Sequence, residues 1–288
     1  MNVPNPPYGR PEVVEPGVVR LLAYNPSPFT FTGTQTYIVG FEELVVIDPG
    51  PDLADHVATL IAAVAGRRVA AITCTHTHRD HSPAARALST AIGAPVIGCA
   101  ALELEAVGQR ADASFDSDYA PHRVLRDGEA IEFDGCRLVA VATPGHTSNH
   151  LCFALEGSGV LFTGDHVMGW STSVIVPPDG DMAAYMASLD KLRQRHDRVY
   201  YPAHGPAITK PQQLVRGMIG HRLNREKRIL RLIDEGTGSI EAIVAGAYPA
   251  LDPRLIPAAG GSVLAHLVDL ERRGMVDRQG QTWTITAQ

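Results

Sequence analysis

A dense group of imidazole and carboxylate side chains is the part of this sequence best suited to chemistry. It follows the apolar run 69–72 and reads Thr75-His76-Thr77-His78-Arg79-Asp80-His81. Imidazole and carboxylate together are the ligands that zinc and similar divalent ions prefer. Because alternate side chains of an extended segment share a face, His76 and His78 can hold one ion. Asp80 and His81, beyond a turn, can then face a second ion.

Three further motifs lie later in the chain, each after a short run that is typical of a β-strand. They are Pro144-Gly145-His146-Thr147, Thr163-Gly164-Asp165-His166 and Pro202-Ala203-His204-Gly205. Strands that end at one edge of a sheet bring ligands together from distant parts of a chain. We therefore expect four strand ends to build one site. A polar loop that happens to be rich in histidine would not explain why partners recur downstream.

The order of these motifs resembles that of the metallo-β-lactamase superfamily over about residues 18–210. The resemblance implies an α/β fold, a four-layer αββα sandwich, with two divalent metal ions. It assigns His76, His78 and His146 to the first ion. It assigns Asp80, His81 and His204 to the second ion, and Asp165 to both. We expect zinc, with manganese or iron as alternatives, because nitrogen and oxygen ligands suit all three metals.

Two ions that share one water predict a hydrolase. A divalent ion lowers the pKa of bound water from about 15.7 toward 7, and a hydroxide bridging both ions would attack phosphorus or a carbonyl carbon. Asp80 is the candidate catalytic group, since a ligating carboxylate there can accept and return the proton. Ligating histidines need a partner for their other ring nitrogen. Asp48 and the hydroxyls of Thr73, Thr75 and Thr77 are candidates for that support.

The elements around the first motif are predicted to alternate between strands and helices. Residues 36–39 and 44–47 read as a hairpin, and Asp52 can cap a helix that runs to about residue 65. Ser82 is predicted to cap a second helix, with Pro83 at its first position, that runs to about residue 92. This alternation indicates sheets covered by helices.

The sequence changes character from about Thr209. We expect a long helix over 212–234, a helix over 240–247 capped by Ser239, an amphipathic helix over 262–272 and a terminal hairpin over 274–285. Helices followed by a β-hairpin resemble a winged helix. We therefore expect a catalytic domain at 1–210, a linking helix at 211–235 and a winged-helix domain at 236–288.

The stretch His221-Arg222-Leu223-Asn224-Arg225-Glu226-Lys227-Arg228-Ile229-Leu230 narrows the resemblance. The whole chain is similar to the β-lactamase-like protein 2 branch of the superfamily. Animal members of that branch are single-strand endoribonucleases, and fungal relatives are thioesterases that release polyketides from carrier protein. One departure is Gln35, where the branch implies asparagine. We interpret it as a change in loop packing away from the chemistry.

The substrate stays open between phosphodiester and acyl chemistry. Residues 216–231 carry six basic side chains and one acidic side chain. Such a run is either a solvated helix face or a groove for single-stranded RNA. We take RNA as the leading substrate, a thioester or ester as the alternative, and a β-lactam third. The candidate substrate contacts are His150, His166, Arg222 and Arg225.

A different class of answer is a binding module in which the winged helix recruits nucleic acid and the metal site is vestigial. The complete set of seven ligands argues against that reading. The role of the winged helix stays open between shaping a substrate channel and a homodimer contact.

Composition favours a cytoplasmic protein without a membrane partner. No apolar run approaches the ~20 residues needed to span a bilayer. The start of the sequence has no basic and apolar signal pattern, and the net charge is -6. We expect the four cysteines to be buried thiols in a reducing compartment; they are Cys74, Cys99, Cys136 and Cys152.

Overall fold

The computed structural model describes residues 6–102 and 115–286. The chain divides into two compact units. The first unit comprises residues 1–143, 149–171 and 196–211, and the second comprises residues 144–148, 172–195 and 212–288. The domain boundaries expected from the sequence stay a prediction, because two short segments inside the expected catalytic domain group with the second unit.

The first unit is built on two mixed β-sheets, each of five strands within the described residues. The first sheet has the order β1-β2-β3-β4-β5, with bounds β1 (Glu12–Glu15), β2 (Val18–Leu22), β3 (Gln35–Gly40), β4 (Glu43–Ile47) and β5 (Arg68–Thr73). The second has the order β12-β11-β10-β9-β8, with bounds β8 (Ala130–Phe133), β9 (Cys136–Ala142), β10 (Leu151–Leu155), β11 (Val160–Gly164) and β12 (Val199–Pro202). Strands β4 and β5 pair in parallel, as do β11 and β12, and the other pairs in both sheets are antiparallel.

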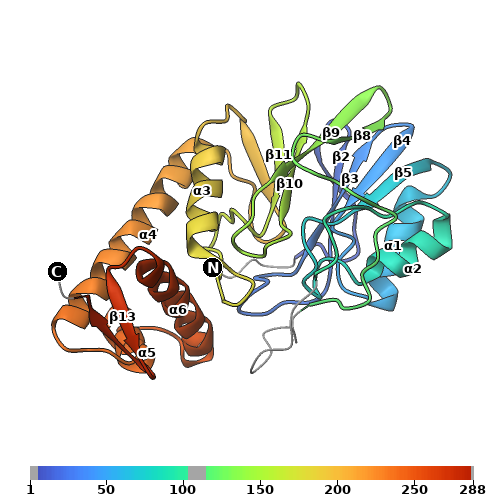
Figure 1. The fold of residues 1–288 in the computed structure, drawn as a ribbon. Coiled ribbons are helices and arrows are strands. Elements are labelled where there is room, and N and C mark those ends of the chain that lie inside the picture. The colour runs from blue at the N-terminus through green and yellow to red at the C-terminus, as the bar shows by residue number, and fades with distance from the viewer. Residues whose placement is uncertain (1–5, 103–114, 287–288) are drawn as a thin grey trace. The chain divides into compact units, whose positions relative to one another are not determined.

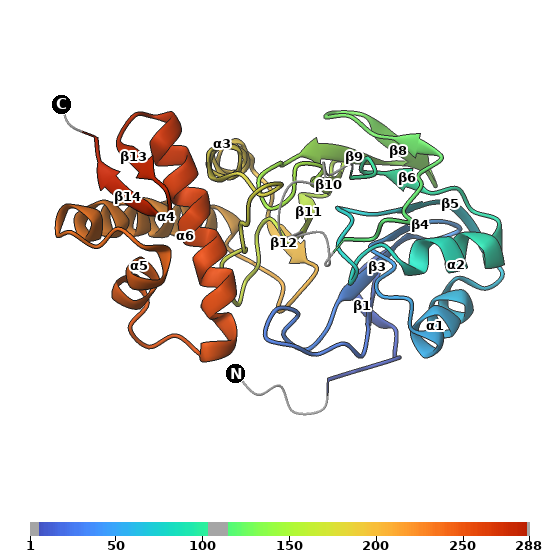
Figure 2. The same cartoon turned by 60° about the horizontal axis from the view of Figure 1, so that its bottom comes forward.

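The two sheets share one hydrophobic core. Val45 and Ile72 of the first sheet belong to the same buried cluster as Leu138 and Phe162 of the second. Helices α1 (Ala54–Val64) and α2 (Ala84–Ile92) lie together beside the first sheet (Figures 1 and 2). Because β4 is covered on both faces, it reads as an apolar run and not as an alternating pattern. A short parallel pair, β6 (Ile97–Gly98) with β7 (Arg123–Val124), continues from this region.

The first turns of both helices differ from the sequence prediction. Helix α1 begins at Ala54 after Leu53, so Asp52 does not cap it. Helix α2 begins at Ala84, and its first N–H donates to the Gly50 carbonyl at 3.0 Å. The Ser82 hydroxyl donates instead to Asp116 at 2.8 Å. A tertiary partner has therefore taken the hydroxyl that the local pattern offered to the helix.

The second unit contains four α-helices and one hairpin within the described residues. Their bounds are α3 (Met182–Arg193), α4 (Pro211–Asp234), α5 (Ile240–Ala247), α6 (Ile256–Arg272), β13 (Val276–Gln279) and β14 (Thr282–Ile285), with a 3-10 turn η2 (Pro253–Leu255) before α6. Ile243 of α5, Val263 and Leu267 of α6 and Trp283 of β14 share a buried cluster. The Ser239 hydroxyl accepts from the Ala242 N–H at 3.3 Å, which confirms the predicted cap.

Helix α6 begins at Ile256, about two turns earlier than predicted. Pro257 stands in its first turn, where its missing N–H costs nothing. Gly261 does not end the helix because tertiary packing uses it. A Cβ on Gly261 would lie 2.7 Å from Cγ2 of Val176.

Candidate metal centre

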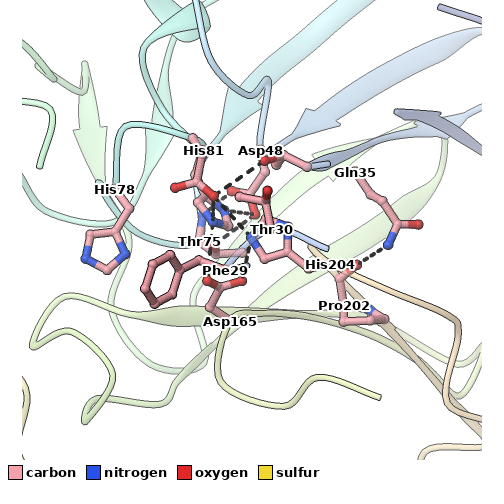
Figure 3. A network of polar contacts seen from close by, with 12 residues as sticks. Phe29, Thr30, Gln35, Asp48, Thr75, His78, His81, Asp165, Pro202 and His204 are labelled. Carbon is pink, nitrogen blue, oxygen red and sulfur yellow. Dashed lines mark hydrogen bonds and ion pairs between the residues drawn. The ribbon is translucent and has the colours of Figure 1, made fainter. Parts of the chain in front are cut away.

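Six of the seven predicted ligands lie in the first unit and come together beyond the ends of three strands. His76, His78, Asp80 and His81 follow β5, Asp165 follows β11 and His204 follows β12. The ligand atoms of His76, His78 and Asp165 all lie within 4.8 Å of one another. Those of Asp80, His81 and His204 do so as well. Two His/Asp groups of the kind that hold divalent ions therefore stand at one edge of the sandwich (Figure 3).

The seventh ligand, His146, lies in segment 144–148 of the second unit. Its Nδ1 lies 2.6 Å from the Val174 carbonyl oxygen of the same unit. That contact assigns the ring proton to Nδ1 and leaves the lone pair on Nε2. Its part in the first ion's site stays a prediction.

The outer nitrogens of His76, His81 and His204 show the same pattern. Nδ1 lies 3.0 Å from Thr75 Oγ1 in His76, 3.1 Å from Asp48 Oδ2 in His81 and 3.2 Å from the Gly33 carbonyl oxygen in His204. Ligating histidines usually have such a partner, because it fixes the tautomer and the ring orientation.

Asp48 performs the support that the sequence suggested. Its Oδ1 accepts from the Thr75 backbone N–H at 2.7 Å, and its Oδ2 accepts from the Thr75 hydroxyl at 2.8 Å. The residue has a φ of 48°, a left-handed conformation that aspartate tolerates better than most residues. Asp48 therefore joins the start of the metal motif to the ring of His81.

The inner face of the site pairs two carboxylates with two imidazoles. Asp80 Oδ2 lies 3.3 Å from His81 Nε2 and 3.1 Å from His204 Nε2. Asp165 reaches the same two nitrogens at 3.6 Å and 3.3 Å. Since Asp165 also belongs to the group of His76 and His78, it is placed to serve both groups.

The electrostatics of this cluster favour charged forms. Burial opposes the charge on Asp80 and Asp165, but the neighbouring His81 and His204 hold the pKa of both carboxyls well below the ordinary range. Burial likewise opposes protonation of His204, yet Asp165 and Asp80 raise its pKa to about 10. In the absence of an ion, imidazolium groups balance the carboxylates. Metal binding must release those protons.

The donor set fits divalent cations. His81 Nε2 is buried and has no hydrogen-bond partner among the described residues, although two carboxylates lie near it. A cation between these groups would satisfy the nitrogen and both acids. Thiolates take no part, since no cysteine belongs to either group. Cys74, Cys99 and Cys152 are buried as predicted, whereas Cys136, at the start of β9, is exposed and corrects that prediction.

The position of Gln35 corrects the prediction that this residue lies away from the candidate metal site. Its Nε2 donates to the Gly205 carbonyl at 2.6 Å, and its backbone N–H donates to the Ala203 carbonyl at 2.8 Å. Both acceptors are neighbours of His204. The hydroxyl of Tyr37 adds a third bond to this turn, to the Pro202 carbonyl at 2.7 Å. A polar residue at the first position of β3 was the available signal, and sequence reasoning missed its role.

The loop between β2 and β3, which is held by hydrogen bonds of its own side chains, also reaches the site. The Thr34 hydroxyl lies 3.4 Å from Asp80 Oδ2, and Asn25 bonds both the hydroxyl and the backbone N–H of Thr34 at 2.9 Å. The hydroxyl of Ser27 accepts from the N–H of Phe29 at 3.1 Å. Phe29 is 48% exposed, and Figure 3 draws its ring beside the donor cluster.

His150 and His166 are buried and do not present a surface to substrate. His150 Nδ1 lies 2.9 Å from the Thr143 hydroxyl, and its Nε2 accepts from the Asp165 N–H at 3.3 Å. It therefore holds the backbone of Asp165. The ring of His166 lies 5.7 Å from that of His150, and the side chain is fully buried.

The arginines proposed to contact substrate are engaged within the second unit. Arg222 is 3% exposed and donates to the Ser173 carbonyl. The guanidinium of Arg225 lies 3.6 Å above the ring of Tyr248 and also donates to the Ala247 carbonyl. These contacts stabilise the unit and do not leave an open basic groove at these positions.

Comparison with known proteins identifies the family. Residues 29–204 match the metallo-β-lactamase superfamily. The chain belongs to the metallo-β-lactamase superfamily. Residues 239–283 match the β-lactamase associated winged helix domain, so the second unit carries a winged helix. No helix in the described ranges is long and apolar enough to cross a membrane.

Three relatives illustrate how far this superfamily membership extends along the chain. An atrochrysone carboxyl ACP thioesterase of Aspergillus fumigatus is 31% identical over 90% of this chain and 78% of that protein. A β-lactamase-like protein 2 homolog of Caenorhabditis elegans is 30% identical over 78% of this chain and 73% of that protein. The structure of a β-lactamase domain protein from Burkholderia ambifaria superimposes with a TM-score of 0.81 at 21% identity, covering 98% of this chain and 95% of that one. This last likeness concerns the fold.

Proposed function

We propose that this protein hydrolyses thioesters at a binuclear metal centre. The observation that carries the proposal is the 31% identity, over 90% of the chain, to a carrier-protein thioesterase. The donor groups described above supply the chemistry that such an activity needs. The substrate class that this favours is an acyl group carried on the thiol of a carrier.

The chain's residues would hold the two ions in the pattern expected for the superfamily. His76, His78 and His146 would hold the first, and Asp165 would be shared. Asp80, His81 and His204 would hold the second. Two bound ions would supply an activated water and a Lewis acid for the thioester carbonyl. Zinc remains the expected metal.

Asp80 would accept the proton of the attacking water and pass it on. Its side chain is 27% exposed, against 12% for Asp165, so Asp80 is the more accessible carboxylate of the pair to water and substrate. It can take the proton of the attacking water as the new C–O bond forms. When the C–S bond breaks, the proton can pass to the departing sulfur. A thiolate leaves readily, because free thiols have a pKa of about 8.5.

Two observations favour acyl over phosphodiester chemistry. The exposed ring of Phe29, held by a braced loop beside the donors, offers an apolar contact that suits an acyl chain. Arg222 is buried and Arg225 stacks on Tyr248, so neither side chain lines an open groove for a nucleic-acid backbone. RNA cleavage, the leading expectation from the sequence, therefore gives way to thioester hydrolysis.

Release of a free thiol tests this activity. Metal-loaded protein should liberate thiol from an acyl-pantetheine thioester, as followed with a thiol-reactive dye. Removal of the metal with a chelator should abolish the release, and added zinc should restore it. Thiol release that survives complete metal removal, or no release from any acyl-pantetheine in fully loaded protein, would overturn the proposal.

A further inference from the structure

The second unit contains a cavity of about 260 Å³ that is lined by residues of α3, α4 and α6. Each helix turns one stripe of side chains toward it. These side chains include Met182 and Met186 from α3, Arg222, Leu223 and Glu226 from α4, and His266 from α6. Arg222 and Glu226 come from the motif that starts at His221, which the metal centre does not use.

His266 gives the cavity a buried polar group that no described residue satisfies. It is 1% exposed, and neither of its ring nitrogens has a hydrogen-bond partner among the described residues. Burial, together with nearby cations led by Arg222, lowers its pKa to about 3. The ring is therefore neutral near pH 7 and presents one N–H donor and one lone pair. Leaving both unpaired in a dry interior would cost free energy.

Arg222 adds a second unsatisfied donor and a charge without a counter-ion. One of its terminal nitrogens donates to Ser173, but its Nε is buried and unpartnered among the described residues. The nearest ring, Tyr185, lies 5.2 Å from the guanidinium carbon. No carboxylate within the described part of the chain pairs with Arg222. A buried guanidinium of this kind favours an anion that can reach it.

The two acids of the cavity lining share one arginine. Arg273 donates to both oxygens of Glu226 at 2.9 Å and to Asp269 at 3.2 Å. The lining therefore carries two carboxylates and two guanidiniums, but both carboxylates bond Arg273 and neither pairs with Arg222. The remaining walls are apolar, formed by Met182, Met186 and Leu223.

We propose that this cavity binds a small carboxylate with an apolar body, such as a short-chain acyl or aryl acid. The carboxylate would accept from Arg222 Nε and from the N–H of His266, the two buried donors that lack a partner among the described residues. The apolar body would pack against Met182, Met186 and Leu223. Ordered water alone would satisfy the nitrogens but would leave the methionine wall wet. This site is separate from the metal donors and does not rest on the proposed thioesterase activity.

Methyl resonances of the methionines can report binding at this site directly. The chain has 6 methionines, so protein labelled with ¹³C in the methionine methyl groups gives few signals to assign. Titration of the metal-loaded full chain with hexanoate should shift Met182 and Met186 and saturate at one equivalent. Met168, three residues after Asp165, should not move. Hexanol, which has the same chain without the charge, should shift these signals at least tenfold more weakly.

Variants distinguish the cavity from other carboxylate sites. Arg222→Gln should weaken hexanoate binding at least tenfold, while Arg216→Gln, an exposed position on the same helix, should bind as the wild type does. If Arg222→Gln does not fold, Met186→Trp should fill the cavity and abolish the shift of Met182. The proposal is overturned if hexanoate shifts Met168 alone, if no signal shifts, if hexanol matches hexanoate, or if a folded variant with a filled cavity still binds.

Discussion

Gln35 Nε2 lies 2.6 Å from the carbonyl oxygen of Gly205, the residue that follows His204. The backbone N–H of the same glutamine bonds Ala203, the residue that precedes His204. One residue of β3 therefore holds both sides of a metal-ligand turn. Arg20 in turn donates to Gln35 Oε1 at 3.0 Å, which fixes the orientation of the amide.

Replacing Gln35 should weaken the second ion without removing a ligand. Gln35→Leu keeps a similar volume but loses the bonds to Gly205 and Arg20. Partners outside the ligand shell typically contribute 10–100-fold to metal affinity, and we expect a loss of about that size for the second ion alone. Competition with a chromogenic chelator measures both affinities. Gln213→Leu, at an exposed position of α4, is the matched control, and equal weakening of both ions would speak against this role.

Replacing individual ligands should lower the occupancy of one particular ion or of both. His78→Ala should lower occupancy of the first ion most, and His204→Ala that of the second. Asp165→Ala should lower both, because its carboxylate serves both groups. Elemental analysis of metal-saturated protein should give two ions per chain in the wild type. A saturated wild type with no more than one ion would reject the binuclear centre.

The arginines of α4 should matter for stability and not for RNA. Changing Arg222, Arg225 and Arg228 to Ala removes a buried bond, a stacked contact and an exposed bond to the Gly246 carbonyl. We therefore expect the free energy of unfolding to fall by roughly 2 kcal/mol or more. Urea unfolding measures this, with Arg216→Ala as the control. The opposite result would support an RNA-binding groove. In that case the triple variant would keep normal stability but lose turnover of RNA selectively, and its RNA binding would depend less on salt.

His266 should make stability depend on pH. Its pKa is lowered to about 3, whereas an unfolded histidine titrates near 6.5. The unfolded chain therefore binds the proton more readily, so this contribution is complete above about pH 6.5 and is lost as the pH falls toward 3. Between pH 7.5 and 5 the wild type should lose about 2 kcal/mol more than His266→Phe in urea unfolding. Parallel pH profiles for the two proteins would contradict the buried neutral ring.

The metal motif was predictable because its geometry is local. His76 and His78 alternate in an extended segment, and strand ends bring Asp165 and His204 to them. The superfamily fold followed from the order of such motifs, and the winged helix followed from helices that precede a β-hairpin. The comparisons confirm both. The local pattern alone also predicted the helix cap at Ser239, where no distant partner among the described residues competes for the hydroxyl.

Features decided by distant partners escaped the sequence. The hydroxyl of Ser82 bonds Asp116 instead of capping α2, and Gln35 reaches a turn that lies about 170 residues away. Arg222 was predicted to contact substrate, because a basic run does not reveal which of its side chains are buried. These outcomes depend on tertiary contacts, which cannot be predicted from the periodicity of the sequence.

The most direct test of the thioesterase assignment is a substrate panel on one metal-loaded preparation. The panel comprises an acyl-pantetheine thioester, a labelled single-stranded RNA, bis-nitrophenyl phosphate and nitrocefin. We predict turnover of the thioester, with RNA, phosphodiester and β-lactam no faster than in metal-stripped protein. Asp80→Asn, checked for full metal content, should lower kcat on the thioester by roughly 10²-fold or more, as for a positioned acid–base group. Metal-dependent cleavage of RNA with an inert thioester would contradict the assignment.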